Sequence, residues 1–147
     1  MNNILTVCIG NICRSPVAEA LLQSRLPGRK VWSAGLHALV GHAAEPTAQE
    51  IAMQHGLDLS SHRAQQLAGW MCTHADLVLV METSHQQEME KLYPTARGKI
   101  RRLGEFGPLG GFDIADPYRK PRAAFEVSHA AIVRGVDEWV RRINLVS

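Results

Sequence analysis

Ten consecutive residues near the start of the chain constrain its fold more than any other part of the sequence. They read Val7-Cys8-Ile9-Gly10-Asn11-Ile12-Cys13-Arg14-Ser15-Pro16. An apolar run precedes them and a helical pattern follows, which predicts a strand ending at Cys8, a tight loop and a helix beginning near Pro16. Gly10 and Asn11 both tolerate backbone with positive φ, and Ser15 is a preferred helix N-cap. Such a loop can turn its N–H groups toward one point beside the helix N-terminus, which predicts a binding site for a phosphate-like dianion.

Two reactive residues lie at the ends of this loop. Cys8 is expected at the carboxyl end of a strand, where open α/β sheets bind their ligands. A helix N-terminus and a nearby arginine both favour the thiolate form of a cysteine, so Cys8 is a candidate nucleophile. Arg14 carries a planar guanidinium that can hold two phosphoryl oxygens at once. The spacing Cys-x5-Arg therefore allows one loop to place a nucleophile and a clamp around a single phosphorus atom.

The bulk properties are those of a small globular protein. A chain of 147 residues fits a single domain, 1–147, and no apolar run approaches the ~20 residues that span a bilayer. The net charge of +2 is too small to indicate nucleic-acid binding, and the basic clusters at 97–102 and 119–122 either attract an anionic phosphopeptide or simply face water. The three cysteines favour a reducing compartment, and the polar loop begins too early for a secretory signal. We therefore expect a cytoplasmic protein that does not insert into a membrane.

Strand and helix patterns alternate along the chain. Strands are expected over 3–8, 31–34, 77–81 and 100–103, and helices over 16–25, 46–55, 83–93 and 121–145. A long segment containing glycine and proline, 104–121, joins the last strand to the last helix, and loops of that length are usually functional or disordered. This order predicts an α/β domain with a parallel sheet and helices on both faces.

The loop 7–16 resembles the signature of low-molecular-weight protein tyrosine phosphatases, and the resemblance extends over essentially the whole chain. It implies a single three-layer domain with a four-stranded parallel sheet of order 2-1-3-4, and hydrolysis of phosphotyrosine through a phosphocysteine without a cofactor. Cys8 would be the nucleophile and Arg14 the clamp. The loop residues expected to bind substrate are Ile9, Gly10, Asn11, Ile12, Cys13 and Ser15. The positions whose hydrogen bonds hold the loop in this family correspond to Asn11, Ser15, Ser33 and His62.

The reaction also needs a proton donor, because tyrosine has a pKa of ~10 and its phenolate is a poor leaving group. Asp116, in Asp116-Pro117-Tyr118, resembles the general acid of the family, and Pro117 restricts the backbone of the residue before it. Asp113 is the local competitor but lacks the Pro-Tyr context. Tyr118 and Leu36 are expected to form two walls for the substrate ring, although either can equally be a surface residue that caps the core.

Cys13, in the same loop as Cys8, is a candidate resolving cysteine for reversible oxidation. The alternative is that it packs under the loop as a small apolar residue. We expect no metal site, because the seven histidines form no recognisable ligand pattern. Within the family, the segments 33–41 and 116–120 look most like bacterial enzymes paired with exopolysaccharide tyrosine kinases. The implied partner is the phosphotyrosine tail of such a kinase, and the expected state is a monomer or weak dimer.

Two other functions fit parts of the pattern. An arsenate reductase on the same fold uses additional cysteines after the central strand, but Met81-Glu82-Thr83 occupies that place and Cys72 precedes the strand alone. A non-catalytic phosphotyrosine-binding module would keep Arg14 and the loop. It would have little reason to keep both Cys8 and Asp116.

Overall fold

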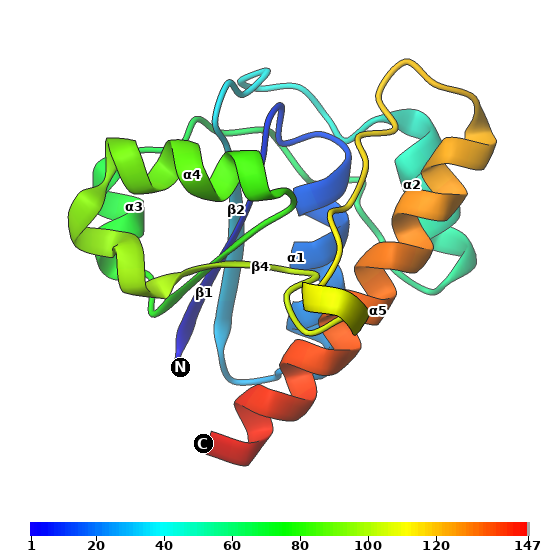
Figure 1. The fold of residues 1–147 in the computed structure, drawn as a ribbon. Coiled ribbons are helices and arrows are strands. Elements are labelled where there is room, and N and C mark those ends of the chain that lie inside the picture. Colours follow the sequence, from blue (N-terminus) through cyan, green and yellow to red (C-terminus); the bar gives the residue numbers. More distant parts are fainter. Residues whose placement is uncertain (147) are drawn as a thin grey trace.

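A parallel β-sheet stands at the centre of the structure, a computed structural model that describes residues 1–146; Ser147, the last residue of the predicted domain, lies outside the described residues. The strands are β1 (Asn3–Cys8), β2 (Lys30–Gly35), β3 (Leu77–Val80) and β4 (Ile100–Arg102). They pair in parallel in the order β2-β1-β3-β4, which confirms the sheet that the resemblance implied. Their carboxyl ends therefore lie along one edge of the twisted sheet; in Figure 1, β1 and β2 run upward to this edge.

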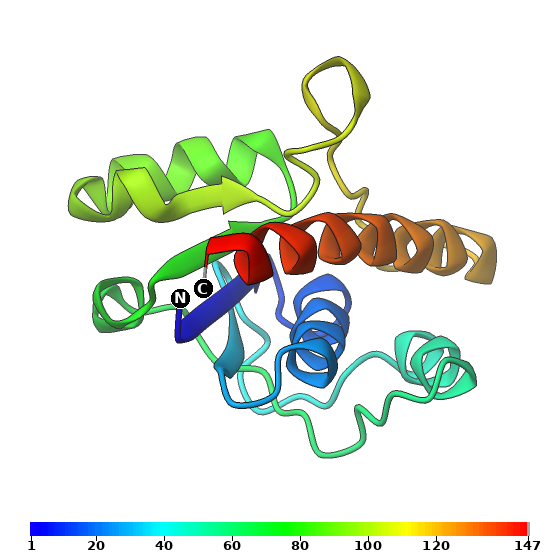
Figure 2. The same cartoon turned by 90° about the horizontal axis from the view of Figure 1, so that it is seen from below.

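Helices cover both faces of the sheet (Figures 1 and 2). On one face lie α1 (Arg14–Arg25) and α5 (Arg122–Val146), with α2 (Pro46–Gln54) packed against α5. On the other face lie α3 (Gly69–His74) and α4 (Thr83–Leu92), and two 3-10 turns, η1 (Pro94–Lys99) and η2 (Pro108–Gly110), flank β4. Within residues 1–146, no helix is long and apolar enough to cross a membrane.

The alternation of side chains along the strands divides the core into two parts. Leu77 and Leu79 face the layer of α1 and α5, whereas Val78 and Val80 face the layer of α3 and α4. All four are buried, which explains the uninterrupted apolar run in this strand, because a parallel strand is covered on both faces.

Two elements differ from the sequence prediction. Helix α1 begins at Arg14 and not near Pro16, and its N-cap is Cys13, which makes no side-chain capping bond; Ser15 is therefore not the cap but lies in the first turn. Helix α3 was not predicted, because its six residues are too few to show a helical period. It buries Met71 and Cys72 against the sheet.

Gly35, at the end of β2, fixes the start of the loop that follows β1. It stands opposite Cys8 in the strand register, and the pairing continues past the strand, with Leu36 N donating to Cys8 O and His37 N donating to Ile9 O. A Cβ at position 35 would lie 2.5 Å from the carbonyl oxygen of Ile9 and 3.0 Å from Ala38 Cα. Only glycine permits this close approach of the two backbones.

We expect Gly35→Ala to lower the free energy of unfolding by about 1–3 kcal/mol, because the added carbon overpacks two backbone segments that cannot move independently. Urea unfolding measures this change. Gly98→Ala is the control, since a Cβ at position 98 would meet no atom within 4 Å. A Gly35→Ala protein as stable as wild type would show that the loop is not fixed by this contact.

Candidate active site

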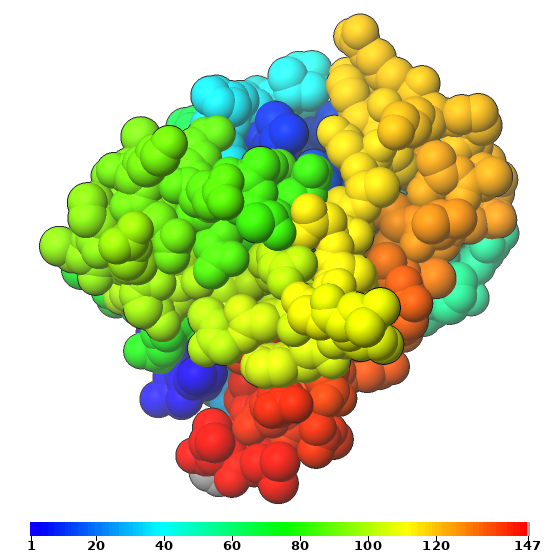
Figure 3. Space-filling model, in the orientation of Figure 1, coloured from blue at the N-terminus to red at the C-terminus, as the bar shows by residue number. Residues whose placement is uncertain are grey.

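Cys8 lies on the wall of a cavity of about 370 Å³ at the carboxyl edge of the sheet. The loop and the start of α1 contribute Ile9, Gly10, Ile12, Cys13 and Arg14; the other lining residues are His37, Leu39, Asp116, Tyr118 and Arg119. In Figure 3 the blue N-terminal atoms are recessed between the cyan segment that follows β2 and the yellow segment that precedes α5. Three segments that are distant in sequence thus meet around one sulfur atom.

Asn11 shapes the loop that carries Cys8 and Arg14. Its φ of 58° is left-handed, whereas Gly10 does not have a positive φ, so the turn that we expected from either residue is made by Asn11. Its amide Nδ2 donates to Ser15 Oγ at 2.8 Å and to Ser33 Oγ at 3.0 Å. Its own carbonyl oxygen lies 2.7 Å from His62 Nε2. The structure therefore brings the four predicted supporting residues together around one turn.

Two of the residues expected to bind substrate, Asn11 and Ser15, are completely buried and do not line the cavity. The side chain of Asn11 therefore supports the loop through Ser15 and Ser33 and does not reach the cavity. Ser15 Oγ lies 3.0 Å from Cys8 Sγ, on the buried side of the sulfur. The Ser15 hydroxyl is therefore placed to donate a hydrogen bond to the sulfur.

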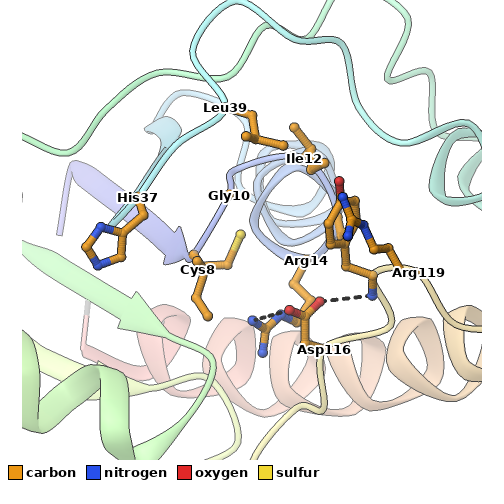
Figure 4. Close-up of a pocket in the computed structure, with 11 residues that line it drawn as sticks. Cys8, Gly10, Ile12, Arg14, His37, Leu39, Asp116 and Arg119 are labelled. Carbon is orange, nitrogen blue, oxygen red and sulfur yellow. Dashed lines mark hydrogen bonds and ion pairs between the residues drawn. The ribbon is translucent and has the colours of Figure 1, made fainter.

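Arg14 is 1% exposed and is anchored along one edge of its guanidinium. Nη1 donates to Glu82 Oε2 at 2.5 Å and to Ile114 O at 2.7 Å. Nη2 lies 3.7 Å from Asp116 Oδ2, an ion pair drawn in Figure 4. Nε is buried and has no hydrogen-bond partner among the described residues. This arrangement leaves Nε and Nη2 to hold two oxygens of an anion.

Glu82, which sequence reasoning did not assign to the site, is the carboxylate that holds Arg14. It follows β3 closely at the carboxyl edge of the sheet, and that position was the only signal available in the sequence. His85, one turn along α4, is buried with Nε2 3.5 Å from Glu82 Oε2. Burial, followed by the charge of Arg14, lowers the pKa of His85, so the histidine stays neutral and Glu82 keeps Arg14 as its cationic partner.

The two candidate aspartates occupy different environments. Asp116 lines the cavity, and its Oδ1 accepts from Tyr118 N at 3.0 Å. Asp113 does not line the cavity; its Oδ1 accepts from Thr83 N, Thr83 Oγ1 and Arg102 Nη1, each at 3.1 Å. Asp113 therefore joins β4 to the start of α4, and Asp116 is the carboxyl group that lies beside Arg14 in the cavity that Cys8 also lines (Figure 4).

The expected wall at Leu36 requires correction. Leu36 is 6% exposed and packs in the core with Ala34, away from the cavity. Because pairing continues beyond β2, residue 36 points to the same face of the sheet as residue 34. His37 and Leu39 form this wall instead, opposite Tyr118 and Arg119, whose guanidinium carbon lies 5.3 Å from the centre of the Tyr118 ring.

Cys13 lines the same cavity as Cys8, and all three cysteines are free. The pKa of Cys13 is raised to about 12, first by burial and then by the charges of Cys8, Asp116 and Glu45, which together outweigh the lowering by Arg14. Cys72 lies in α3, in the opposite part of the core, where burial raises its pKa as well. Between Met1 and Val146, no group of three or more potential ligands is arranged to hold a metal ion.

Comparison with known proteins gives concordant matches. The family model described as low molecular weight phosphotyrosine protein phosphatase matches residues 3–145. The probable low molecular weight protein-tyrosine-phosphatase EpsP of Ralstonia nicotianae is 53% identical over 144 residues, which are 98% of this chain and 97% of that protein. The crystal structure of the Erwinia amylovora tyrosine phosphatase AmsI has a TM-score of 0.91 at 46% identity, covering 96% of this chain and 92% of that one. Vibrio vulnificus Wzb in complex with benzylphosphonate has a TM-score of 0.91 at 39% identity, covering 96% and 98%.

The surroundings of Cys13 predict how it reacts with an alkylating reagent. A pKa of about 12 keeps Cys13 almost entirely as thiol at pH 7.5, and only the thiolate reacts. Iodoacetamide should therefore modify Cys8 first and leave Cys13 intact. The charge of Cys8 is one cause of the raised pKa, so Cys13 should react faster in Cys8→Ser than in wild type at the same pH.

Initial rates from mass spectrometry of the fragmented peptide 1–14 measure this difference. Cys72 is the internal control, because Cys8 does not contribute to its raised pKa and its rate should be the same in both proteins. Equal Cys13 rates in the two proteins would contradict the electrostatic link between the two loop cysteines.

Proposed function

Because this chain belongs to the low molecular weight phosphotyrosine protein phosphatase family, we propose that it hydrolyses phosphotyrosine in proteins through a phosphocysteine formed on Cys8. One observation carries the proposal: Cys8 and Asp116 line one cavity with Arg14, whose Nε and Nη2 are not used by its anchors. These are the nucleophile, acid and clamp that phosphoryl transfer to a thiolate requires.

In the first step the Cys8 thiolate attacks phosphorus in line with the tyrosine oxygen. The bond between phosphorus and that oxygen breaks, and the oxygen takes a proton from Asp116 as it leaves. Backbone N–H groups of the loop and the free edge of Arg14 stabilise the charge on the three equatorial oxygens. Glu82 and Ile114 hold Arg14 before substrate arrives, so the clamp needs little rearrangement in the transition state.

In the second step water attacks the phosphorus of phosphocysteine while Asp116, now a carboxylate, accepts a proton from the water. The bond between sulfur and phosphorus breaks, and inorganic phosphate leaves. The electron pair returns to Cys8, where the Ser15 hydroxyl stabilises the thiolate. Each residue that acts on the substrate in these steps lines the cavity.

The cavity fits an aryl phosphate. Its volume of about 370 Å³ is in the range of small-ligand sites, and Tyr118, Ile12 and Leu39 give it apolar walls beside the anion site. Benzylphosphonate, an aromatic ring joined to a phosphonate, occupies the related Vibrio vulnificus protein. That complex supports the proposal that the substrate is phosphotyrosine.

On this proposal, the substrate in the cell is the phosphotyrosine tail of a bacterial tyrosine autokinase of exopolysaccharide synthesis. The phosphatase acts on it in the cytoplasm, as a monomer or weak dimer. The support is the similarity to EpsP and AmsI. Mixing the purified phosphatase with such an autophosphorylated kinase tests it. Rapid loss of tail phosphate is expected, and a tail hydrolysed no faster than an unrelated phosphotyrosine peptide would contradict it.

Reversible oxidation is a second part of the proposal. Peroxide would oxidise the Cys8 thiolate to sulfenic acid, and the Cys13 thiol would condense with it to give a disulfide and water. Sulfenic acid is neutral, so one cause of the raised Cys13 pKa is removed at the moment of this reaction. Their shared cavity supports the pairing. After brief peroxide treatment, dithiothreitol should restore wild type more fully than Cys13→Ser, and equal recovery would leave Cys13 a packing residue.

The two alternative functions receive less support. Arsenate reduction through further cysteines would require Cys72 near Cys8, but Cys72 is buried in the other part of the core. A binding module has no need of a protonating carboxyl group such as Asp116 beside the clamp. Turnover of p-nitrophenyl phosphate, with and without arsenate and thioredoxin, separates all three functions.

The assignment of nucleophile and clamp predicts that Cys8→Ser and Arg14→Ala each abolish turnover of p-nitrophenyl phosphate. Wild type should stay fully active in excess EDTA, because no step uses a metal. Cys72→Ser and Arg97→Ala are the matched controls, since neither position lines the cavity, and both should retain activity. An active Cys8→Ser protein, or a requirement for metal, would refute this mechanism.

The assignment of Asp116 as the acid predicts a dependence on the leaving group. Asp116→Asn should slow hydrolysis by ~10²–10⁴-fold for aryl phosphates whose phenols have a high pKa, and less for those whose phenols have a low pKa. Asp113→Asn should change the rates little, because Asp113 is bonded to Thr83 and Arg102 outside the cavity. A larger effect at Asp113 would reverse the assignment.

A further inference from the structure

The hydrogen bonds behind the phosphate loop form a chain that ends at Glu19, a residue of α1 to which the mechanism assigns no role. Glu19 Oε1 accepts from Ser33 Oγ at 2.5 Å, and Ser33 Oγ accepts from Asn11 Nδ2 at 3.0 Å. Asn11 Nδ2 also donates to Ser15 Oγ at 2.8 Å. This serine oxygen lies 3.0 Å from Cys8 Sγ. An unbroken path of contacts thus leads from a half-buried carboxylate to the nucleophilic sulfur.

The groups at the two ends of this series of hydrogen bonds determine which atom donates and which accepts in each bond. The backbone N–H of Gln65 can only donate, and it donates to Asn11 Oδ1 at 2.9 Å, so the amide nitrogen of Asn11 must face the two serines. An ionised carboxylate can only accept, so the single hydroxyl hydrogen of Ser33 must point to Glu19. Ser33 therefore presents only lone pairs to Asn11.

The direction of the last bond follows from the others. Ser15 Oγ accepts from Asn11, and its own hydrogen is left for Cys8 Sγ. This is the polarity that a thiolate needs, because a thiolate can only accept. In the opposite polarity the thiol of Cys8 would donate to Ser15, which favours the protonated and unreactive form.

We propose that Glu19 is a positioning residue that stabilises the thiolate of Cys8 through Ser33, Asn11 and Ser15; this inference rests on the proposed role of Cys8 as nucleophile. Without the carboxylate, the hydrogen of the buried Ser33 hydroxyl has no fixed acceptor and can turn toward the Asn11 amide. Two donors would then face each other, and the amide would move away from Ser15. The bond from Ser15 to Cys8 would weaken as a result.

Glu19 lines a second cavity, distinct from the one that contains Cys8. This second cavity has a volume of about 350 Å³ and shares no lining residue with the cavity of Cys8. The titratable or charged side chains that line this second cavity with Glu19 are Asp58, His62 and Arg63, all from the segment between α2 and α3. His62 Nε2 faces the carbonyl oxygen of Asn11, which can only accept. This nitrogen therefore carries a hydrogen whether the imidazole ring is neutral or charged. A change in the charge of His62 does not reverse the direction of the hydrogen bonds between Glu19 and Cys8.

Hydrogen bonding and bare charge predict opposite effects of removing Glu19. As a bare negative charge, Glu19 would disfavour a second negative charge on Cys8, and its removal would extend the reactivity of the thiolate to lower pH. As the end of the hydrogen-bond chain, its removal should restrict that reactivity to higher pH. The sign of the change therefore decides between the two roles.

The test measures the rate at which iodoacetamide alkylates Cys8 as a function of pH, with the site located by peptide fragmentation. In Glu19→Met, which keeps the length of the side chain without an acceptor, we expect the midpoint of the profile to rise by roughly one pH unit. Glu19→Ala should show the same change. Glu19→Gln should stay near wild type, because its amide oxygen can still accept from Ser33. Glu126→Ala, on the exposed side of α5, is the control and should not change the profile.

A double-mutant cycle tests whether Glu19 acts through Ser33. Ser33→Ala should itself raise the midpoint, and adding Glu19→Met to it should raise the midpoint no further. An unchanged or lowered midpoint in Glu19→Met, or a full additional rise in the Ser33→Ala background, would overturn the proposal. Alkylation requires no turnover, so inactivity toward p-nitrophenyl phosphate would refute the proposed function without affecting this result.

Discussion

The left-handed turn at Asn11 is the constraint on which the rest of the site depends. A residue other than glycine adopts this conformation at a cost of roughly 1–2 kcal/mol, and here four hydrogen bonds that Asn11 makes with Ser15, Ser33, Gln65 and His62 offset it. These partners come from α1, from β2 and from the segment after α2. The loop therefore keeps its shape only when α1, β2 and the segment after α2 have assembled around it.

The same assembly prepares the charges of the site. Arg14 lies almost completely buried, which would be costly for an isolated cation, and Glu82 and Ile114 provide its acceptors. Glu82 follows closely after β3, Ile114 lies in the segment between β4 and α5 and donates its N–H to Met81 O, and Cys8 is the last residue of β1. The parallel sheet thus brings nucleophile, clamp and clamp anchors to one edge, although the clamp Arg14 and its anchor Ile114 are 100 residues apart in the chain.

The parts that the sequence predicted are those whose information is local. The loop from Cys8 to Arg14, the Asp-Pro-Tyr segment at Asp116 and the four strands each depend on neighbouring residues, so their patterns could be interpreted from the sequence before the fold was known. The sequence predicts that the first helix begins near Pro16, two residues after its actual start at Arg14. The reason is that Ser15 is a typical N-cap residue, whereas in the structure its hydroxyl contacts Cys8 and Asn11. The sequence does not predict α3, because its six residues are too few to show the hydrophobic periodicity of a helix.

The parts that the sequence did not predict depend on contacts between distant segments. Leu36 was expected in the cavity, and only the continued pairing beyond β2 determines that it faces the core while His37 and Leu39 face the ligand. Glu82 and Glu19 carry no motif of their own. Their roles follow from partners 68 and 14 residues away in the chain, which the sheet order and the packing of α1 on β2 bring into contact.

The central claim is that one sulfur, Cys8, carries the phosphoryl group during turnover, and rapid-quench trapping tests it most directly. Wild type mixed with an activated aryl phosphate and quenched in acid within milliseconds should contain one phosphate per chain, attached to Cys8 when the peptides are fragmented. The label should be lost when the trapped enzyme completes its turnover in water. Steady turnover without any phosphocysteine, or phosphate attached to another residue, would contradict the account.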